Sequence, residues 1–88
     1  MKLSGNFIKR EIFGEFFLVP IGEVANNVNG LVALNEVSAF IFDCLENECS
    51  ADDLAKKITE YYDVDFETAK KDAEECVEGL AEIGVVVI

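Results

Sequence analysis

The sequence predicts an α+β domain in which a three-stranded antiparallel sheet is followed by three helices. Up to residue 34, short runs of aromatic and β-branched residues are separated by glycine, proline and asparagine, as is typical of strands and turns. From residue 35 to residue 84, apolar residues recur at spacings of three and four behind Asn, Ser and Asp caps, as is typical of helices. The chain of 88 residues is 51% hydrophobic, so residues 1–88 are expected to form a single ordered domain.

The first two strands are predicted to form a hairpin. Residues 7–13 and 15–19 are rich in aromatic and branched side chains, and Gly14 between them supplies the turn. Pro20 has no backbone N–H, so the second strand should stop there. A polar connection from Gly22 to Asn29 is expected to follow.

The third strand is predicted at residues 31–34. This run is short and apolar, and it is bounded by an Asn29–Gly30 step and by Asn35. Side chains alternate between the two faces of a strand, so Val32 and Leu34 share one face while Leu31 and Ala33 share the other. We assign Val32 and Leu34 to the core.

Three helices are indicated by their caps. Asn35 caps the first, which should end near Asn47; Ser50 and Asp53 resemble a capping box that opens the second, which Asp63 breaks. Asp65 caps the third and longest helix, and Gly84 is placed to be its C-terminal cap. The expected buried stripes are Val37, Phe40, Ile41, Cys44 and Leu45 on the first helix, Leu54, Ile58 and Tyr61 or Tyr62 on the second, and Phe66, Ala69, Ala73, Val77 and Leu80, with Cys76 and Ile83 as further candidates, on the third.

The last four residues, 85–88, are uniformly apolar. Four exposed apolar residues would promote association, so this tail should dock against the core or against a strand.

The composition argues against an enzyme. The chain has no histidine, which removes the Ser–His and Cys–His nucleophile pairs and the commonest metal ligand. Its glycines are scattered and form no phosphate-binding loop. Carboxylate pairs such as Asp52–Asp53 and Glu74–Glu75 are neighbours that point in different directions on a helix, so we interpret them as solvated faces. We therefore expect neither catalysis nor a cofactor.

The cysteines are interpreted as reduced structural thiols. Cys44, Cys49 and Cys76 are odd in number and contain no CxxC pair, which indicates neither a disulfide framework nor a metal site. The start of the chain turns polar before a signal-peptide core could form, and no apolar run is long enough to span a membrane. A cytoplasmic protein is expected.

The net charge of −11 limits the partners of this chain. Its excess of acids lies in residues 31–88, where fifteen acids face four bases. The predicted order of elements suits a winged-helix-like arrangement, and many such folds place a helix in the DNA major groove. Here the third helix and its cap carry seven acids and two bases, so phosphate would be repelled. We expect neither nucleic acid nor an anionic membrane as a partner.

A protein-binding surface remains. If residues 31–34 lie at an edge of the sheet, their unpaired backbone groups can pair with an extended peptide, with the third helix as the second wall of a groove. The alternative is that the C-terminal tail covers this strand, whose side chains then serve only the core.

Residues 34–42, LNEVSAFIF, resemble the Leu-Asn-Glu-Thr-x-x-x-Ile-Trp signature of the PqqD-like family, named after coenzyme PQQ synthesis protein D. The resemblance continues at residues 15–22, 29–34, 50–54, 61–65 and 77–86, and so spans nearly the whole chain. Val37 and Phe42 depart from the frequent Thr and Trp, which puts the choice of partner in doubt more than the fold.

The resemblance implies a peptide chaperone without catalysis. Members of the family hold the leader of a ribosomally made precursor peptide as a strand added to the third strand, beside the third helix, and deliver it to a modifying enzyme, often a radical SAM protein. By resemblance, the peptide-binding residues are Leu31, Val32, Ala33 and Leu34 on the strand, and Lys70, Ala73, Glu74 and Val77 on the helix. Replacing Val32 with proline is expected to remove a backbone donor and weaken binding. Two alternatives stay open: a structural or regulatory subunit that associates through its helices, and a DNA-binding regulator.

Overall fold

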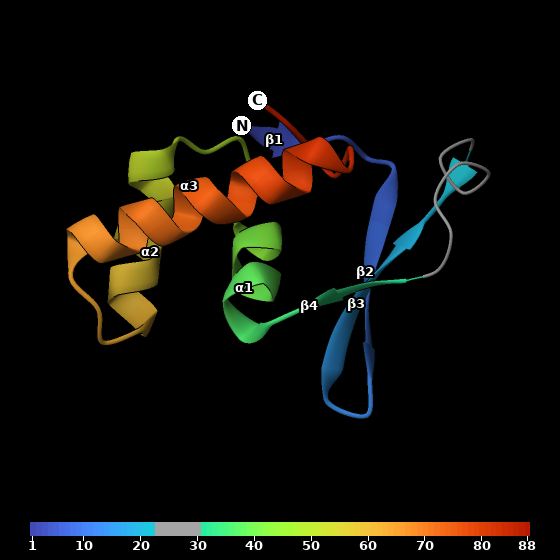
Figure 1. Cartoon of the computed structure of the whole chain (residues 1–88), viewed down its shortest axis with the longest axis horizontal. Helices are drawn as coiled ribbons and strands as arrows, with labels where there is room; N and C mark the ends of the chain where they lie inside the picture. Colours follow the sequence, from blue (N-terminus) through green and yellow to red (C-terminus); the bar gives the residue numbers. More distant parts are fainter. Residues whose placement is uncertain (23–30) are drawn as a thin grey trace.

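The computed structural model describes residues 1–22 and 31–88, and it places three strands in one antiparallel sheet. These are β2 (Phe7–Ile12), β3 (Glu15–Pro20) and β4 (Val32–Leu34), in the order β2-β3-β4, so β4 is an edge strand (Figure 1). The hairpin, the end of its second strand at Pro20 and the third strand are confirmed. The predicted polar connection falls on residues 23–30, which lie outside the described residues.

The hairpin turn consists of Phe13 and Gly14, which link the paired residues Ile12 and Glu15. Both turn residues have positive φ, 51° and 79°, as a type I′ turn requires. Glycine adopts this conformation freely, but phenylalanine does not. Phe13 is also fully exposed, so its ring gains no burial in return.

The three helices are α1 (Glu36–Cys44), α2 (Ala51–Tyr61) and α3 (Phe66–Glu82). Their predicted N-caps are confirmed: the side chains of Asn35, Ser50 and Asp65 each accept a backbone N–H three residues on, at 2.7, 3.1 and 3.1 Å. At Ser50 the capping box is complete, because its N–H donates to the Asp53 carboxylate at 3.0 Å. The first helix ends at Cys44, three residues before the predicted end.

Gly84 terminates α3, as predicted. Its φ of 84° turns the chain back, and its N–H donates to the Ala81 carbonyl at 3.1 Å. The next N–H, of Val85, donates to the Leu80 carbonyl at 2.9 Å. This pair of bonds is the Schellman motif, and it sends the tail toward the core.

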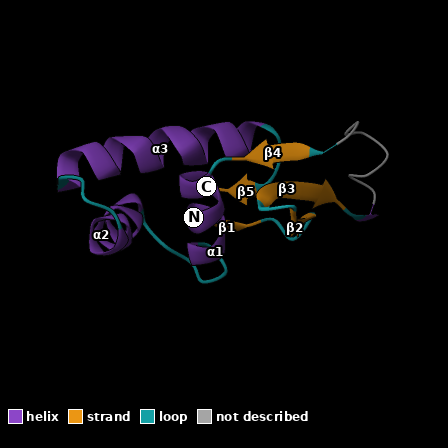
Figure 2. Ribbon diagram, turned by 90° about the horizontal axis from the view of Figure 1, so that it is seen from below, coloured by secondary structure: helices purple, strands orange, loops and turns teal. Residues whose placement is uncertain are grey.

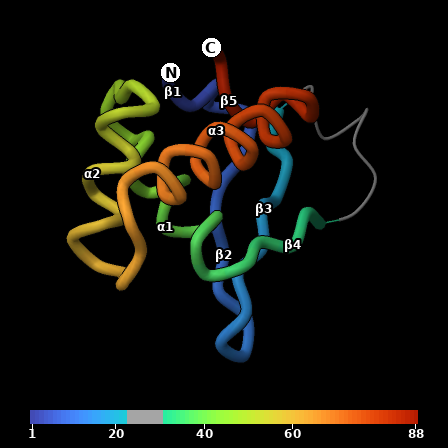
Figure 3. The backbone as a smooth tube through the Cα atoms, turned by 60° about the vertical axis from the view of Figure 1, so that its left-hand side comes forward, coloured from blue at the N-terminus to red at the C-terminus, as the bar shows by residue number. Residues whose placement is uncertain are grey.

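The tail docks as predicted, but on a strand that the sequence did not reveal. Val85 and Val86 are buried, and β5 (Val86–Val87) pairs with β1 (Lys2–Leu3) in a separate two-stranded sheet. The two termini therefore lie side by side (Figures 1 and 3). Since the tail pairs with β1, the alternative in which it covers β4 is wrong.

The core is one cluster shared by α1, α2, α3 and the inner face of the sheet. Its completely buried side chains come from all of these elements and from the tail: Leu18, Ile41, Leu45, Leu54, Val77 and Val85. Val32 and Leu34 are half-buried against this cluster, whereas Leu31 and Ala33 are exposed, in agreement with the predicted faces. No helix within the described ranges is long and apolar enough to cross a membrane.

Some of the predicted helix faces are wrong. In α1, Phe42 is only 6% exposed and belongs to the core, while Phe40 is half-buried beside the rings of Tyr61 and Tyr62. In α3, Phe66 is 44% exposed. The other predicted residues Val37, Cys44, Tyr62 and Cys76 are half-buried and pack against the core, as predicted, whereas Tyr61 and Ile83 are exposed.

Candidate functional site

The direction of the backbone groups along β3 follows from one hydrogen bond. The Ile21 N–H donates to the Asn6 carbonyl at 2.8 Å, next to the pair Phe7–Pro20. Hydrogen-bonded and non-hydrogen-bonded pairs alternate along antiparallel strands. The odd-numbered residues of β3 therefore point their backbone groups toward β2, and the even-numbered Phe16 and Leu18 point theirs toward β4.

The same alternation fixes the edge of β4. Leu34 and Val32 lie opposite Phe16 and Leu18, so their N–H and C=O groups face β3. Ala33 lies between them and directs its N–H and C=O to the other side, away from the sheet. Within the described residues no strand pairs with that side. β4 thus presents a hydrogen-bond donor and an acceptor at a free edge.

The side chains along this edge leave room for another chain. Ala33 is small and exposed, and Leu31 beside it is 52% exposed. Val32 and Leu34 pack against the core and hold the strand in place. A second backbone can approach this edge closely, because the exposed Ala33 is small and the strand is held in place by the side chains packed on the core.

A hollow of about 400 Å³ lies between the start of α1 and one face of α3. It is lined by Asn35, Val37 and Ser38, and on α3 by Asp72, Glu75 and Cys76. The Cys76 thiol lies 3.5 Å from the Ser38 hydroxyl, so the two helices are in contact at this point. Asn35 directly follows β4, and α3 and β4 lie along the same side of the molecule (Figure 2). The hollow therefore begins at the residue that follows β4.

None of the α3 residues predicted to bind the peptide lines this hollow. Ala73 and Val77 are in the core, 0% and 2% exposed, and have no surface to offer to a ligand. The Lys70 ammonium pairs with the Asp52 carboxylate of α2 at 3.0 Å, and this hydrogen bond raises the pKa of Lys70. Glu74 is exposed. Packing against α2 sets the rotation of α3, and it turns Asp72, Glu75 and Cys76 toward the hollow instead.

Metal-ligating side chains and thiols are scattered over the described residues. No group of three histidine, cysteine, aspartate or glutamate side chains within them is placed to hold a metal ion. Burial raises the pKa of the Cys44 thiol, which disfavours the nucleophilic thiolate. The arrangement provides backbone hydrogen bonds and a hollow, which suit binding.

Comparison with known proteins agrees with this geometry. The family model described as coenzyme PQQ synthesis protein D (PqqD) matches residues 18–86. A solved structure titled "TbiB1 in Complex with the TbiA(beta) Leader Peptide" is 23% identical and covers 93% of this chain and 90% of its own, with a TM-score of 0.74. A second, titled "Lasso peptide synthetase B1 complexed with the leader peptide", is 22% identical and covers 99% and 96%, with a TM-score of 0.79. At these identities the two structures establish the shared fold. Comparison with curated proteins found no match.

Proposed function

The chain belongs to the PqqD family, and from this premise we propose that it is a recognition element for a ribosomally made precursor peptide. Residues 1–88 act as one domain that holds the leader of the precursor as an added strand on β4. The complex is then presented in the cytoplasm to a modifying enzyme, such as a radical SAM protein. The chain itself takes no catalytic part. One observation carries this proposal: the backbone of Ala33 at the edge of the sheet, with which no strand of residues 1–22 or 31–88 pairs.

Strand addition uses the groups that the edge leaves open. An incoming backbone would accept a hydrogen bond from the Ala33 N–H and donate one to its C=O, and Leu31 would contribute in the same way by alternation. Val32 and Leu34 are bonded to β3, so their part is to anchor the edge. The two similar structures were determined with leader peptides, which is the class of ligand that this edge fits.

The hollow beside the edge would select side chains of the leader. Val37 offers it an apolar wall, while Asp72 and Glu75 place two carboxylates at its rim. We therefore propose that α3 contributes Asp72, Glu75 and Cys76, with Glu74 at the flank. A leader with Lys or Arg beside its apolar anchor complements these charges. Its affinity should fall as salt is raised to physiological ionic strength; an affinity independent of salt contradicts this preference.

The proposal is tested by backbone amide NMR during titration with a leader peptide whose gene lies next to the gene for this chain. On binding, the Ala33 amide should shift and exchange more slowly with solvent, because its N–H becomes hydrogen-bonded. Val32 and Leu34 are already bonded within the sheet, so they serve as internal controls. Shifts confined to the β2–β3 hairpin, with Ala33 unprotected at saturation, would refute binding at this edge.

A further inference from the structure

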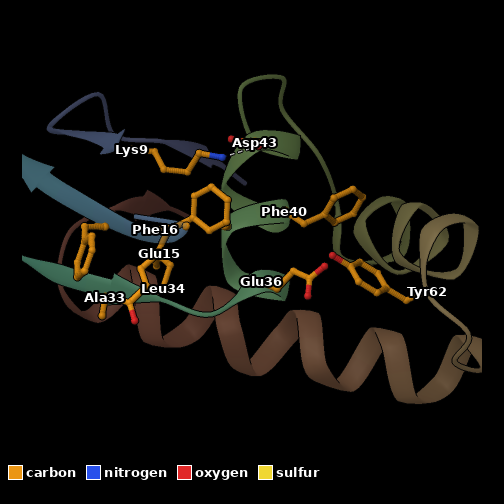
Figure 4. Close-up of a pocket in the computed structure, with 12 residues that line it drawn as sticks. Lys9, Glu15, Phe16, Ala33, Leu34, Glu36, Phe40, Asp43 and Tyr62 are labelled. Carbon is orange, nitrogen blue, oxygen red and sulfur yellow. Dashed lines mark hydrogen bonds and ion pairs between the residues drawn. The ribbon is translucent and has the colours of Figure 1, made fainter. Parts of the chain in front are cut away.

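A second hollow, of about 550 Å³, opens between the β2–β3 hairpin, β4 and α1 (Figure 4). It uses the face of α1 that carries Glu36, Phe40 and Asp43, whereas the hollow beside α3 uses Val37 and Ser38. None of its lining residues belongs to α3. Ala33 and Leu34 of β4 also line it, so this second hollow adjoins the proposed leader edge, while its other walls lie away from α3.

The walls of the second hollow are aromatic and its rim is acidic. Phe16, Phe40 and Tyr62 supply ring surfaces, and the rings of Phe40 and Tyr62 meet edge to face with centroids 5.7 Å apart. Glu15, Glu36 and Asp43 stand against a single base, Lys9. Figure 4 shows Phe40 and Tyr62 on one side of Glu36 and Phe16 on the other.

Lys9 displays the chemistry that these walls favour. Its ammonium lies 2.6 Å from an Asp43 carboxylate oxygen and 4.9 Å from the centroid of the Phe16 ring, so it combines an ion pair with a cation–π contact. Lys9 thereby balances Asp43. The carboxylates of Glu15 and Glu36 have no ion-pair partner among the described residues.

Glu36 acts on the opposite aromatic wall. Partial burial and, after it, the negative charge of Glu36 raise the pKa of the Tyr62 hydroxyl. The carboxylate of Glu36 and the aromatic rings of Phe40 and Tyr62 line the same hollow.

We propose that this hollow binds an arginine side chain presented by a partner protein. The guanidinium would stack on Phe40 or Tyr62 and pair with the Glu36 carboxylate, repeating on this wall what Lys9 does on the other. Arginine fits better than lysine because its planar, weakly hydrated group can stack and donate two hydrogen bonds at once. The net charge of −11 also attracts a basic surface. Identifying the partner with the modifying enzyme rests on the proposed function; the chemistry of the hollow does not.

The test uses N-acetyl-L-arginine amide as a probe and N-acetyl-L-citrulline amide, of the same shape without the charge, as its control. In two-dimensional NMR titrations of the whole chain, the arginine probe should shift resonances of Glu36, Phe40 and Tyr62. The citrulline probe should bind at least about fivefold more weakly, because it lacks the charge-assisted bonds. Equal binding of the two probes, or shifts elsewhere only, would overturn the proposal.

Two variants locate the site. Glu36→Gln should weaken the arginine probe about five- to tenfold, and Phe40→Leu, which keeps an apolar side chain but removes the ring, about two- to fivefold. Glu78→Gln removes the same charge from an exposed position on α3 outside both hollows and should change nothing. If Glu36→Gln binds the arginine probe as tightly as Glu78→Gln does, the probe does not bind in this hollow. If Glu36→Gln fails to fold, the same comparison is made between Phe40→Leu and Glu78→Gln.

The experiment can distinguish failure of the proposed arginine site from failure of leader binding at β4. Glu36→Gln should leave the affinity for the leader unchanged and lower the affinity for the modifying enzyme at least about fivefold. Loss of leader binding with unchanged enzyme binding would overturn the second docking site while leaving strand addition in place. The second docking site would also be overturned if Glu36→Gln and Phe40→Leu both bound the modifying enzyme with the affinity of the parent chain.

Discussion

Replacing Ala33 with proline tests whether the outward edge of β4 receives a strand. In the free chain, the Ala33 N–H points away from β3, so a proline there removes no hydrogen bond of the sheet. The free energy of unfolding should change by no more than about 1 kcal/mol, mainly through the restricted φ of proline.

The effect on binding should be much larger. One backbone hydrogen bond to the leader, worth about 0.5–1.5 kcal/mol, is lost, and the leader carbonyl left without a donor costs about 1–3 kcal/mol more. The smaller values of the two ranges together give about 1.5 kcal/mol, which corresponds to roughly a tenfold loss of affinity. Titration calorimetry with the leader measures this loss, and thermal unfolding followed by circular dichroism confirms that the variant is folded.

Val32→Pro is the matched comparison, and the structure changes what it tests. The Val32 N–H faces β3, so proline at this position breaks the sheet and should lower the free energy of unfolding by about 1–3 kcal/mol. The sequence predicts weaker binding for this variant; from the register, we expect a loss of sheet stability as well. A folded Ala33→Pro variant that binds the leader within twofold of the parent, or two proline variants of equal stability, would refute the assigned direction of the edge.

Three further variants test local features of the fold. Gly84→Ala places a side chain at a φ of 84° and should destabilise the chain by about 1–2 kcal/mol in urea unfolding, although no atom lies within 4 Å of the added carbon. Phe13→Asn, in the type I′ turn, should raise the stability by up to about 1 kcal/mol, since asparagine tolerates positive φ; a loss of stability would show that the exposed ring has a structural role. Hydrogen bonds from Ser50, of which the bond from its backbone N–H has the largest effect, lower the pKa of Asp53 below 3.8. These bonds therefore stabilise the folded chain above pH 3.8, and the stabilisation is lost as the pH falls through the lowered pKa. Asp53→Asn should therefore lower the melting temperature at about pH 6 and have much less effect at about pH 2.5.

The features that the sequence predicted well are local. Each N-cap depends on a side chain and a backbone N–H three residues away, so Asn35, Ser50 and Asp65 could be recognised without knowing the tertiary structure. The same holds for Gly84, whose conformation is required by the end of one helix. Alternation along residues 31–34 placed Val32 and Leu34 correctly for the same reason.

The features that it missed depend on contacts between distant elements. Helix α1 is apolar on several sides, so its spacing selected Phe40 for the core, whereas Phe42 lies in the core cluster and Phe40 is half-buried against it. The inward direction of Ala73 and Val77 was predicted correctly, but which exposed residues of α3 line the hollow depends on contacts with α1, so Asp72 and Glu75 could not be identified from spacing. Strand β1 is only two residues long and exists because the tail returns beside it. The direction in which the Ala33 N–H and C=O point could not be predicted either, because it follows from the register of three strands.

The short edge limits how much affinity strand addition can provide. β4 has three residues, and by alternation the free side offers the groups of Ala33 and its neighbour Leu31. Two to four hydrogen bonds of about 1 kcal/mol each give about 2–4 kcal/mol, whereas micromolar binding requires about 8 kcal/mol. The remainder must come from leader side chains, and the hollow between α1 and α3 is next to this edge. Alanine replacement of the apolar anchor in the leader should therefore reduce affinity more than Ala33→Pro does. If calorimetry shows the opposite order, the backbone edge carries most of the binding and the hollow has no part in it.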